Sequence, residues 1–153
     1  MNFRLFVSEI LGTLFFIGKL PFASGTFGSL FGLYLWFLIK PKLEHSEFLL
    51  LTLGIFFLGV VVSEILTKEW NNSDPKEIVI DELVGMWISL YLNPSELKLA
   101  FISFILFRTF DIFKPGPVKI MDEMHNGIGV MMDDVVAGIL ALLTTQSLIF
   151  YFS

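Results

Sequence analysis

The chain contains no cysteine and few charged residues. None of its 153 residues is Cys, only 16% are Asp, Glu, Lys or Arg, and 55% are hydrophobic. The absence of Cys excludes disulfides, thiolate metal ligands and a cysteine nucleophile. Because soluble domains are about 25% charged, this composition argues against a soluble cytosolic domain and a disordered chain. A formal net charge of −5 argues against a nucleic-acid partner.

Apolar residues form runs that approach the length of a membrane span. A spanning helix needs about 20 apolar residues, or about 17 at the lower limit. The stretches 28–40, 48–66 and 135–152 approach or meet this length, and 79–92 and 98–113 reach it only with polar residues at their ends. Length alone predicts one domain over residues 1–153. We therefore expect an all-α, polytopic integral membrane helical bundle with about four to five short membrane-spanning helices.

The N-terminal segment, the prolines and the positions of the basic residues predict how the chain is arranged in the membrane. Residues 3–17 are apolar but contain Arg4 and Glu9, which favours an amphipathic helix lying at the membrane interface. Pro41, Pro75, Pro94 and Pro115 are expected to mark helix boundaries, with loops at 40–47, 67–77, 93–97 and 114–132. If four helices span the membrane before the loop at 114–132, seven of the ten basic residues lie on the same side of the membrane. The positive-inside rule makes that side cytoplasmic.

A glycine-containing segment opens the first apolar run. Gly25 and Gly28 allow a tight turn and a close backbone approach, while Thr26 and Ser29 offer hydroxyl groups. Free N–H groups at a helix start favour an anion, and Lys19 adds a positive charge. The segment is not a Walker A loop, because no Lys precedes Thr26 or Ser29. Taken alone, this segment slightly favours the simpler interpretation, a helix cap with glycines at a turn.

Two adjacent acids, Asp81 and Glu82, open another apolar helix. Ionisable side chains at the edge of a span are costly and usually functional, although acids in a first turn also complement the helix dipole. Gly85 lies four residues after Asp81, on the same helix face, where it permits close approach of a neighbouring backbone. Two acids followed by a glycine exceed what capping requires, so we favour a functional role.

The same pattern recurs near the C-terminus, where Asp133 and Asp134 precede Gly138. Two helices of this kind can pack with their acids facing each other. Clustered carboxylates repel unless a cation neutralises them. Oxygen ligands alone point to a hard ion, Mg²⁺ or Mn²⁺.

A third cluster combines both charge signs. Arg108, Asp111 and Lys114 are spaced three apart and fall along one helix stripe that ends at Pro115. A surface ion-pair row is the ordinary explanation, but this stripe lies at the end of a predicted span. Carboxylates for a metal, together with Lys19, Arg108 and Lys114 for an anion, indicate phosphoryl chemistry on a lipid phosphate. Hydrolysis and transfer both remain open on these residues, and a small transporter or channel with a carboxylate cation site is the alternative.

Four blocks resemble the phosphatidylglycerophosphatase A family. They read GTFGS at 25–29, IVIDELVGMW at 78–87, FRTFDIFKPGP at 107–117 and GIGVMMDDVVAG at 127–138, in the order of the family. The resemblance implies a bacterial inner-membrane enzyme with its active site facing the cytoplasm. Such an enzyme hydrolyses the terminal phosphate of phosphatidylglycerophosphate to phosphatidylglycerol and requires Mg²⁺. Its partner would be the phospholipid substrate in the membrane.

On this basis the site residues fall into two predicted sets. We expect Asp81, Glu82, Asp133 and Asp134 to hold one or two Mg²⁺ ions, and Lys19, Thr26, Ser29, Arg108 and Lys114 to bind the substrate phosphate. Asp111 either orients Arg108 and Lys114 or joins the metal ligands. Asp122 and His125 are weaker candidates, the latter as a proton donor.

Overall fold

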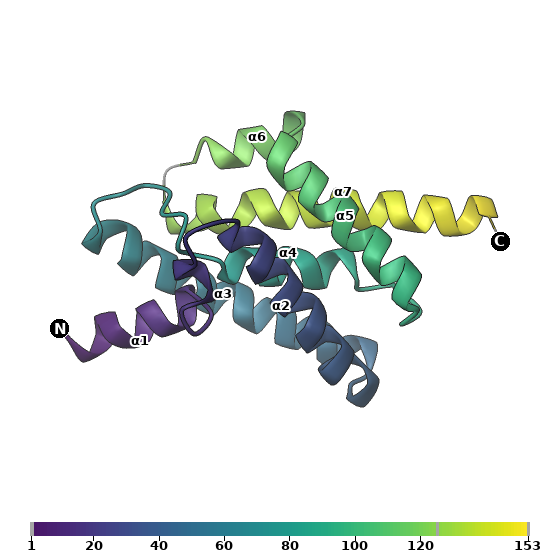
Figure 1. Ribbon diagram of the computed structural model, residues 1–153, viewed down its shortest axis with the longest axis horizontal. Helices are drawn as coiled ribbons and strands as arrows, with labels where there is room; N and C mark the ends of the chain where they lie inside the picture. Colours follow the sequence, from purple (N-terminus) through teal and green to yellow (C-terminus); the bar gives the residue numbers. More distant parts are fainter. Residues whose placement is uncertain (1, 125, 153) are drawn as a thin grey trace.

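The computed structural model describes residues 2–124 and 126–152. In these residues the regular secondary structure is entirely helical, with no strand. The α-helices are α1 (Phe3–Gly12), α2 (Ser24–Ile39), α3 (His45–Glu69), α4 (Ile80–Ser89), α5 (Leu97–Phe113), α6 (Gly116–Asp122) and α7 (Gly127–Phe152). Short 3-10 helices lie at Ile17–Lys19 and Lys40–Lys42. In Figure 1, α7 runs lengthwise and ends at the C-terminus on the right, and α1 lies at the left, near the N-terminus. The prediction of an all-α fold is confirmed.

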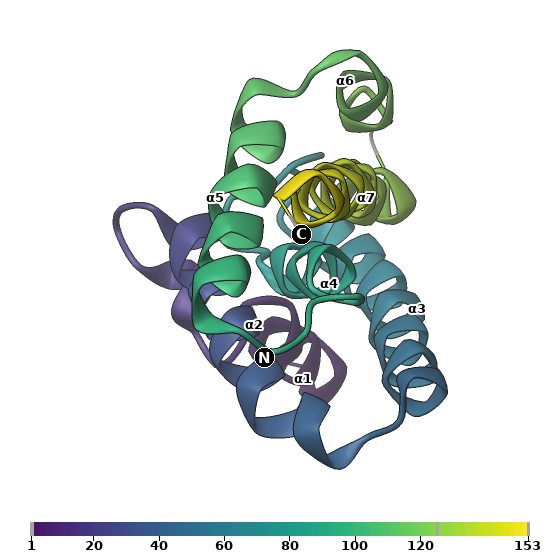
Figure 2. The ribbon, with the colours of Figure 1, turned by 90° about the vertical axis from the view of Figure 1, so that its right-hand side faces the viewer.

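The short helix α4 forms the centre of the bundle. Viewed end-on, it lies among α2, α3, α5 and α7 (Figure 2). Seven of its ten residues are buried, including Val84 and Trp87. Trp87 also donates a hydrogen bond from Nε1 to the carbonyl oxygen of Gly32 in α2, at 2.9 Å. A helix with apolar residues on all sides is stable only when neighbours cover all of them, and this arrangement provides that cover.

Within residues 2–124 and 126–152, two helices are long and apolar enough to cross a membrane. They are α3, with 25 residues, and α7, with 26. The other predicted spans are shorter: α2 has 16 residues, α5 has 17 and α4 has 10. The count of four to five spans therefore remains a prediction for α2, α4 and α5. Helix α1 packs on α3, and its interfacial position likewise remains a prediction.

The helix boundaries agree with the prolines but differ from the predicted loop at 114–132. Pro41, Pro75, Pro94 and Pro115 all lie between α-helices. The predicted loop instead contains α6 and the first turns of α7. The early start of α7 has a local cause, since the Asn126 side chain accepts a hydrogen bond from Gly129 N–H at 2.8 Å. A carboxylate oxygen of Glu64, in α3, accepts another from Gly127 N–H at 2.8 Å.

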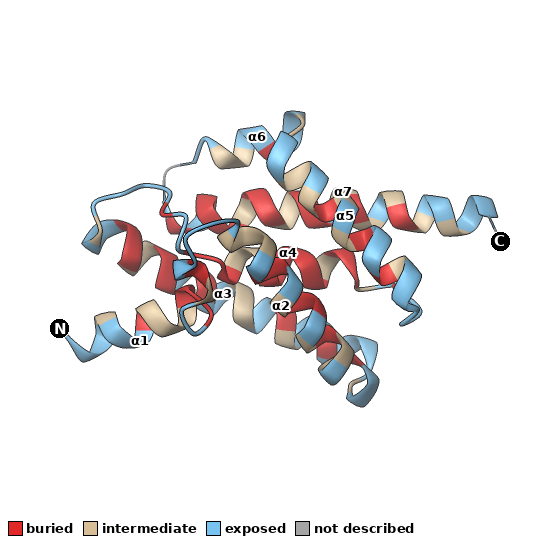
Figure 3. Ribbon diagram, viewed as in Figure 1, coloured by how far each residue is buried: buried red, intermediate tan, exposed pale blue. Residues whose placement is uncertain are grey.

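Helices α4 and α7 cross at their two glycines. A Cβ on Gly85 would lie 2.7 Å from the carbonyl oxygen of Asp134 and 2.6 Å from the Phe107 ring. A Cβ on Gly138 would collide with the carbonyl oxygen of Gly85. Figure 3 shows buried positions along α4 and the facing part of α7, and exposed ones at the far end of α7. The predicted close packing of the two acid-bearing helices is therefore observed.

Candidate active site

A polar cleft of about 530 Å³ lies where the start of α4 meets α7 and the end of α5. The loop before α4 and the start of α2 complete its walls. The lining residues are Ala23, Ser24, Gly25, Asp74, Pro75, Lys76, Ile78, Asp81, Glu82, Arg108, Asp111, Ile112, Lys114, Asp133 and Asp134. Three segments distant in the sequence thus bring their charged residues to one cavity.

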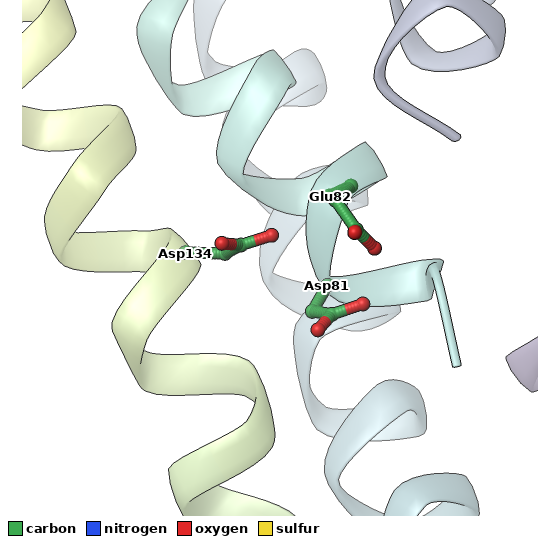
Figure 4. Close-up of side chains that lie close together, drawn as sticks. All are labelled: Asp81, Glu82 and Asp134. Carbon is green, nitrogen blue, oxygen red and sulfur yellow. The ribbon is translucent and has the colours of Figure 1, made fainter. Parts of the chain in front are cut away.

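The first acidic group consists of Asp81, Glu82 and Asp134. Oxygens of these three carboxylates all lie within 4.8 Å of one another. Figure 4 shows Asp134 extending from α7 toward the first turn of α4, which carries Asp81 and Glu82. The glycine crossing brings the two backbones close enough for these side chains to meet.

The second acidic group consists of Asp111, Asp133 and Asp134, whose carboxylate oxygens also lie within 4.8 Å of one another. Asp133 and Asp134 are 8% and 2% exposed. The sequence suggested that these acids open the last helix, but α7 begins at Gly127, so they lie about two turns inside it. There α7 packs against α4, α5 and α6, which cover it.

Two basic side chains are paired with carboxylates of these groups. Arg108 forms an ion pair with Asp111, and its Nη1 lies 3.9 Å from Glu82 Oε1. Arg108 also donates to Ser29 Oγ, at 3.5 Å. Both contacts place the guanidinium at the junction of α2, α4 and α5.

Lys114 ends α5 in a left-handed backbone conformation, with φ of 45°. It forms ion pairs with Asp122 in α6 and with Asp133, the latter at 3.0 Å. Partial burial alone would lower the pKa of Lys114, but the hydrogen bonds and charges of Asp122 and Asp133 outweigh it. The pKa of Lys114 therefore lies above its ordinary value, and the side chain stays positively charged.

Several carboxylate oxygens in the cleft have no hydrogen-bond partner among the described residues. They are Asp81 Oδ1, Glu82 Oε2 and Asp134 Oδ2, all of them inaccessible to solvent. Desolvated carboxylate oxygens are costly unless they are paired or coordinate a metal. Hard oxygen donors of this kind fit Mg²⁺, so the residues present match the cofactor that the sequence predicts.

The other predicted phosphate-binding residues lie at varying distances from this centre. Ser29 contacts Arg108 and donates to the carbonyl oxygen of Gly25 at 2.8 Å. Thr26 and Lys19 do not line the cleft among the described residues. Lys19 instead forms an ion pair with Glu9 of α1. His125 lies outside the described residues.

Sequence reasoning did not single out Ser24, Asp74 and Lys76, which line the cleft. Ser24 donates a hydrogen bond from Oγ to the carbonyl oxygen of Lys76, at 2.9 Å, joining the start of α2 to the loop before α4. Their only signal in the sequence is proximity to the two predicted blocks. An ordinary polar loop would have the same composition.

Comparison with known proteins identifies the family. The family model of phosphatidylglycerophosphatase A matches residues 10–149. The chain belongs to the phosphatidylglycerophosphatase A family. This membership confirms the predicted resemblance and the prediction of a phosphatase, rather than a transporter.

Three curated relatives support the assignment. A protein of Escherichia coli K12 named "Phosphatidylglycerophosphatase A" is 34% identical over 87% of this chain and 78% of its own. A protein of Haemophilus influenzae with the same name is 38% identical over 88% and 84% of the two chains. A Bacteroides thetaiotaomicron protein named "Putative phosphatidylinositol-3-phosphatase" is 37% identical over 88% of each chain. No solved structure matches the chain significantly. The family and these names support a lipid phosphatase.

Proposed function

We propose that this protein hydrolyses the terminal phosphate of phosphatidylglycerophosphate, giving phosphatidylglycerol and inorganic phosphate. The proposal further states that Mg²⁺ is required and that the site faces the cytoplasm at the bacterial inner membrane. The observation that carries it is one cleft in which buried, unpaired carboxylate oxygens lie beside Arg108 and Lys114. Such a cleft offers ligands for a hard cation and donors for a phosphate.

The acidic residues supply the cation site in this proposal. Asp81, Glu82, Asp133 and Asp134 are its ligands, because their carboxylates converge and part of their oxygens lack partners. When bound, Mg²⁺ would supply Lewis acidity and activate water. Without a cation, mutual repulsion of these buried acids would oppose the observed crossing of α4 and α7.

The basic residues bind the substrate in this proposal. Arg108 offers a planar fork of donors suited to phosphate oxygens, and Lys114 offers a charged ammonium group. Both now pair with carboxylates, Arg108 with Asp111 and Lys114 with Asp122 and Asp133. Phosphate oxygens would replace some of these partners. Asp111 would then either orient Arg108 or join the metal ligands, and Ser29 would support the same guanidinium through its existing contact.

The remaining predicted groups, Lys19 and Thr26, lie outside this inner set. Lys19 is the last residue of the 3-10 helix before α2, and its side chain is 43% exposed. From there it would attract the anionic headgroup rather than contact the reacting phosphate. Thr26 lies in the first turn of α2, where its hydroxyl would assist phosphate binding.

The test of function is phosphate release from defined lipids. The full chain, purified in detergent, would be incubated with phosphatidylglycerophosphate after exhaustive chelation, and again with Mg²⁺ restored. We expect no phosphate without Mg²⁺ and release with it, and less turnover with Ca²⁺, which takes larger and looser coordination shells. Full activity after chelation would reject the metal requirement.

A second substrate belongs in the same assay. The relative named as a phosphatidylinositol-3-phosphatase is as similar to this chain as the two named phosphatidylglycerophosphatases. Phosphatidylinositol 3-phosphate would therefore be tested at equal concentration and in the same detergent. Faster release from that lipid would assign the activity to the inositol headgroup instead.

The proposed orientation has its own test. The chain lacks cysteine, so single cysteines report sidedness without background. His45→Cys, at the start of α3, should react with an impermeant thiol reagent in intact cells, whereas Asp74→Cys, beside the cleft, should react only after permeabilisation. Labelling of Asp74→Cys in intact cells would reject a cytoplasmic active site.

A further inference from the structure

The two acidic groups of the cleft share one residue. Asp134 belongs both to the group with Asp81 and Glu82 and to the group with Asp111 and Asp133. A carboxylate has two oxygens and can therefore serve two neighbouring cations. The groups come from different helices, the first from α4 and α7 and the second from α5 and α7, so Asp134 stands between two sets of ligands.

The burial of Asp134 points to a missing partner at that position. The residue is 2% exposed, and its Oδ2 has no hydrogen-bond partner among the described residues. Its side chain extends from α7 toward Asp81 and Glu82 (Figure 4). A buried carboxylate oxygen without a donor is stabilised by a coordinated cation.

The spacing of each group suits a small divalent ion. Mg²⁺ holds oxygens at 2.0–2.1 Å, so two ligands on opposite sides of the ion lie about 4.2 Å apart. Each group already has its oxygens within 4.8 Å of one another. Adjacent ligands of an octahedral ion lie about 2.9 Å apart, so closing either group around an ion would shorten its oxygen separations by at most about 2 Å.

The formal charge of the cleft distinguishes the binding of one divalent ion from the binding of two. The five carboxylates of the two groups, with Arg108 and Lys114, carry a formal charge of −3 when all are ionised. One divalent ion would leave −1, which repels a phosphate monoester of about −1.5 to −2. Two ions would give +1. Counting Asp122, the other partner of Lys114, lowers each value by one and leaves the two-ion cleft neutral.

We infer that the cleft holds two divalent cations side by side, with Asp134 as the ligand common to both. The first ion lies among Asp81, Glu82 and Asp134, and the second among Asp111, Asp133 and Asp134. The second binds more weakly, because Arg108 and Lys114 already compensate Asp111 and Asp133. This inference rests on the proposed metal-dependent phosphatase, and it assigns Asp111 to metal binding.

Manganese provides a readout that does not depend on catalysis. The metal-free full chain in detergent would be titrated with Mn²⁺, measuring bound ions per chain and the electron paramagnetic resonance spectrum. We expect two ions per chain, one tighter than the other. Ions that share a carboxylate, about 3.5–4 Å apart, should give a spin-coupled spectrum.

Three substitutions test the two proposed cation sites separately. Asp111→Asn should leave one ion per chain, with an uncoupled spectrum and the tighter affinity nearly unchanged. Asp134→Asn should abolish the coupled spectrum and weaken both ions. Asp74→Asn, a matched change at a cleft acid outside both groups, should retain two coupled ions. If Asp134→Asn fails to fold, Asp133→Asn replaces it and should leave one ion, as Asp111→Asn does.

The outcomes distinguish this inference from the proposed function. A single bound Mn²⁺ at saturation, or two without spin coupling, would overturn the shared site. If such a preparation still released phosphate with Mg²⁺, the proposed function would stand and only the second ion would be rejected. Two coupled ions without phosphate release from either lipid would instead reject the function and retain the site.

Discussion

Helices α4 and α7 present two opposite environments to the rest of the bundle. On one side their acids line the polar cleft with Arg108 and Lys114. On the other side, toward α3, they border an apolar groove of about 360 Å³. The groove is lined by Leu49, Thr52, Leu53, Phe56, Val84, Ile88, Met132, Val135 and Ile139. Its one polar residue, Thr52, donates its hydroxyl to the carbonyl oxygen of Phe48 at 2.8 Å.

The difference arises from helical phase rather than from distance along the chain. Asp134 and Val135 are adjacent in the sequence, yet they line opposite cavities. Glu82 and Val84, two positions apart in α4, likewise line opposite cavities. Because successive residues turn by about 100° on an α-helix, one short helix pair can present carboxylates to one side and hydrocarbon to the other. Catalysis should depend on the residues of the polar cleft and hardly at all on those of the apolar groove.

The largest effect should follow from removing charge in the cleft. Asp81→Asn and Asp134→Asn preserve shape but lose a charged hard ligand, and each should reduce phosphate release at least ~100-fold. Higher Mg²⁺ should be needed for any recovery. The measurement is the initial rate on phosphatidylglycerophosphate, with Glu123→Gln, an exposed acid after α6, as the control at wild-type rate. Near wild-type rates for both variants would move the centre toward Asp111 and Asp122.

Removing a cation from the same cleft should affect the substrate rather than the metal. Lys114→Gln deletes the charge that contacts Asp122 and Asp133. A hydrogen bond to a charged group contributes about 1.5–3 kcal/mol, so kcat/KM should fall roughly 10- to 100-fold. The affinity for the tighter Mn²⁺ ion, measured separately, should change less than about threefold, since Lys114 pairs with no acid of the group Asp81, Glu82 and Asp134. A large loss of Mn²⁺ binding with intact kcat/KM would contradict this division of roles.

The close crossing of α4 and α7, which separates the polar cleft from the apolar groove, can be tested by thermal stability. Gly85→Ala places a methyl group 2.6–2.7 Å from Phe107 and Asp134, and overpacking of this kind costs about 1–3 kcal/mol. Gly54→Ala, in α3, is the matched control because a Cβ there meets nothing within 4 Å. It should be neutral or stabilising by up to about 1 kcal/mol. Thermal unfolding in detergent should therefore show a lower Tm for Gly85→Ala and an equal or higher Tm for Gly54→Ala than for the unchanged chain, and an equal Tm for both variants would contradict the close crossing.

The smallest effect should come from the apolar groove. Ile139→Ala, in α7 one turn beyond Val135, removes hydrocarbon without touching the cleft. The rate should change less than about twofold, equivalent to about 0.4 kcal/mol in the barrier. Leu53→Ala, on the α3 wall, should behave alike in the same phosphate assay. A tenfold loss at either position, in a protein of normal Tm, would show that the groove contributes to substrate binding.

The chemistry of the cleft was predictable because residue types and local spacing carry it. Paired acids with a glycine four residues later indicated that two helices could approach closely with carboxylates facing. The spacing of Arg108, Asp111 and Lys114 likewise placed three charges on one stripe. Both features depend only on the 3.6-residue period of a helix, which is a property of the local backbone.

Other features depended on contacts between distant segments. Helix α7 begins at Gly127 rather than near Val135, because Glu64 of α3 binds the Gly127 N–H beside the local cap that Asn126 provides. That start places Asp133 and Asp134 about two turns inside the helix. The partner of Lys19 was unpredictable for the same reason, since Glu9 approaches it only through the turn after α1.

The sequence by itself determined the helical class, the apolar surface, the identity of the acids and bases, and the family. The family follows from the resemblance of four sequence blocks, and the other features follow from composition, periodicity and spacing, which act within a few turns of chain. Only the tertiary structure decided that Asp134 lies within reach of both Asp81 and Asp111, and that Arg108 and Lys114 pair with acids of the same cleft. Such contacts join residues tens of positions apart, and their geometry is set by how α4, α5 and α7 pack rather than by any one segment.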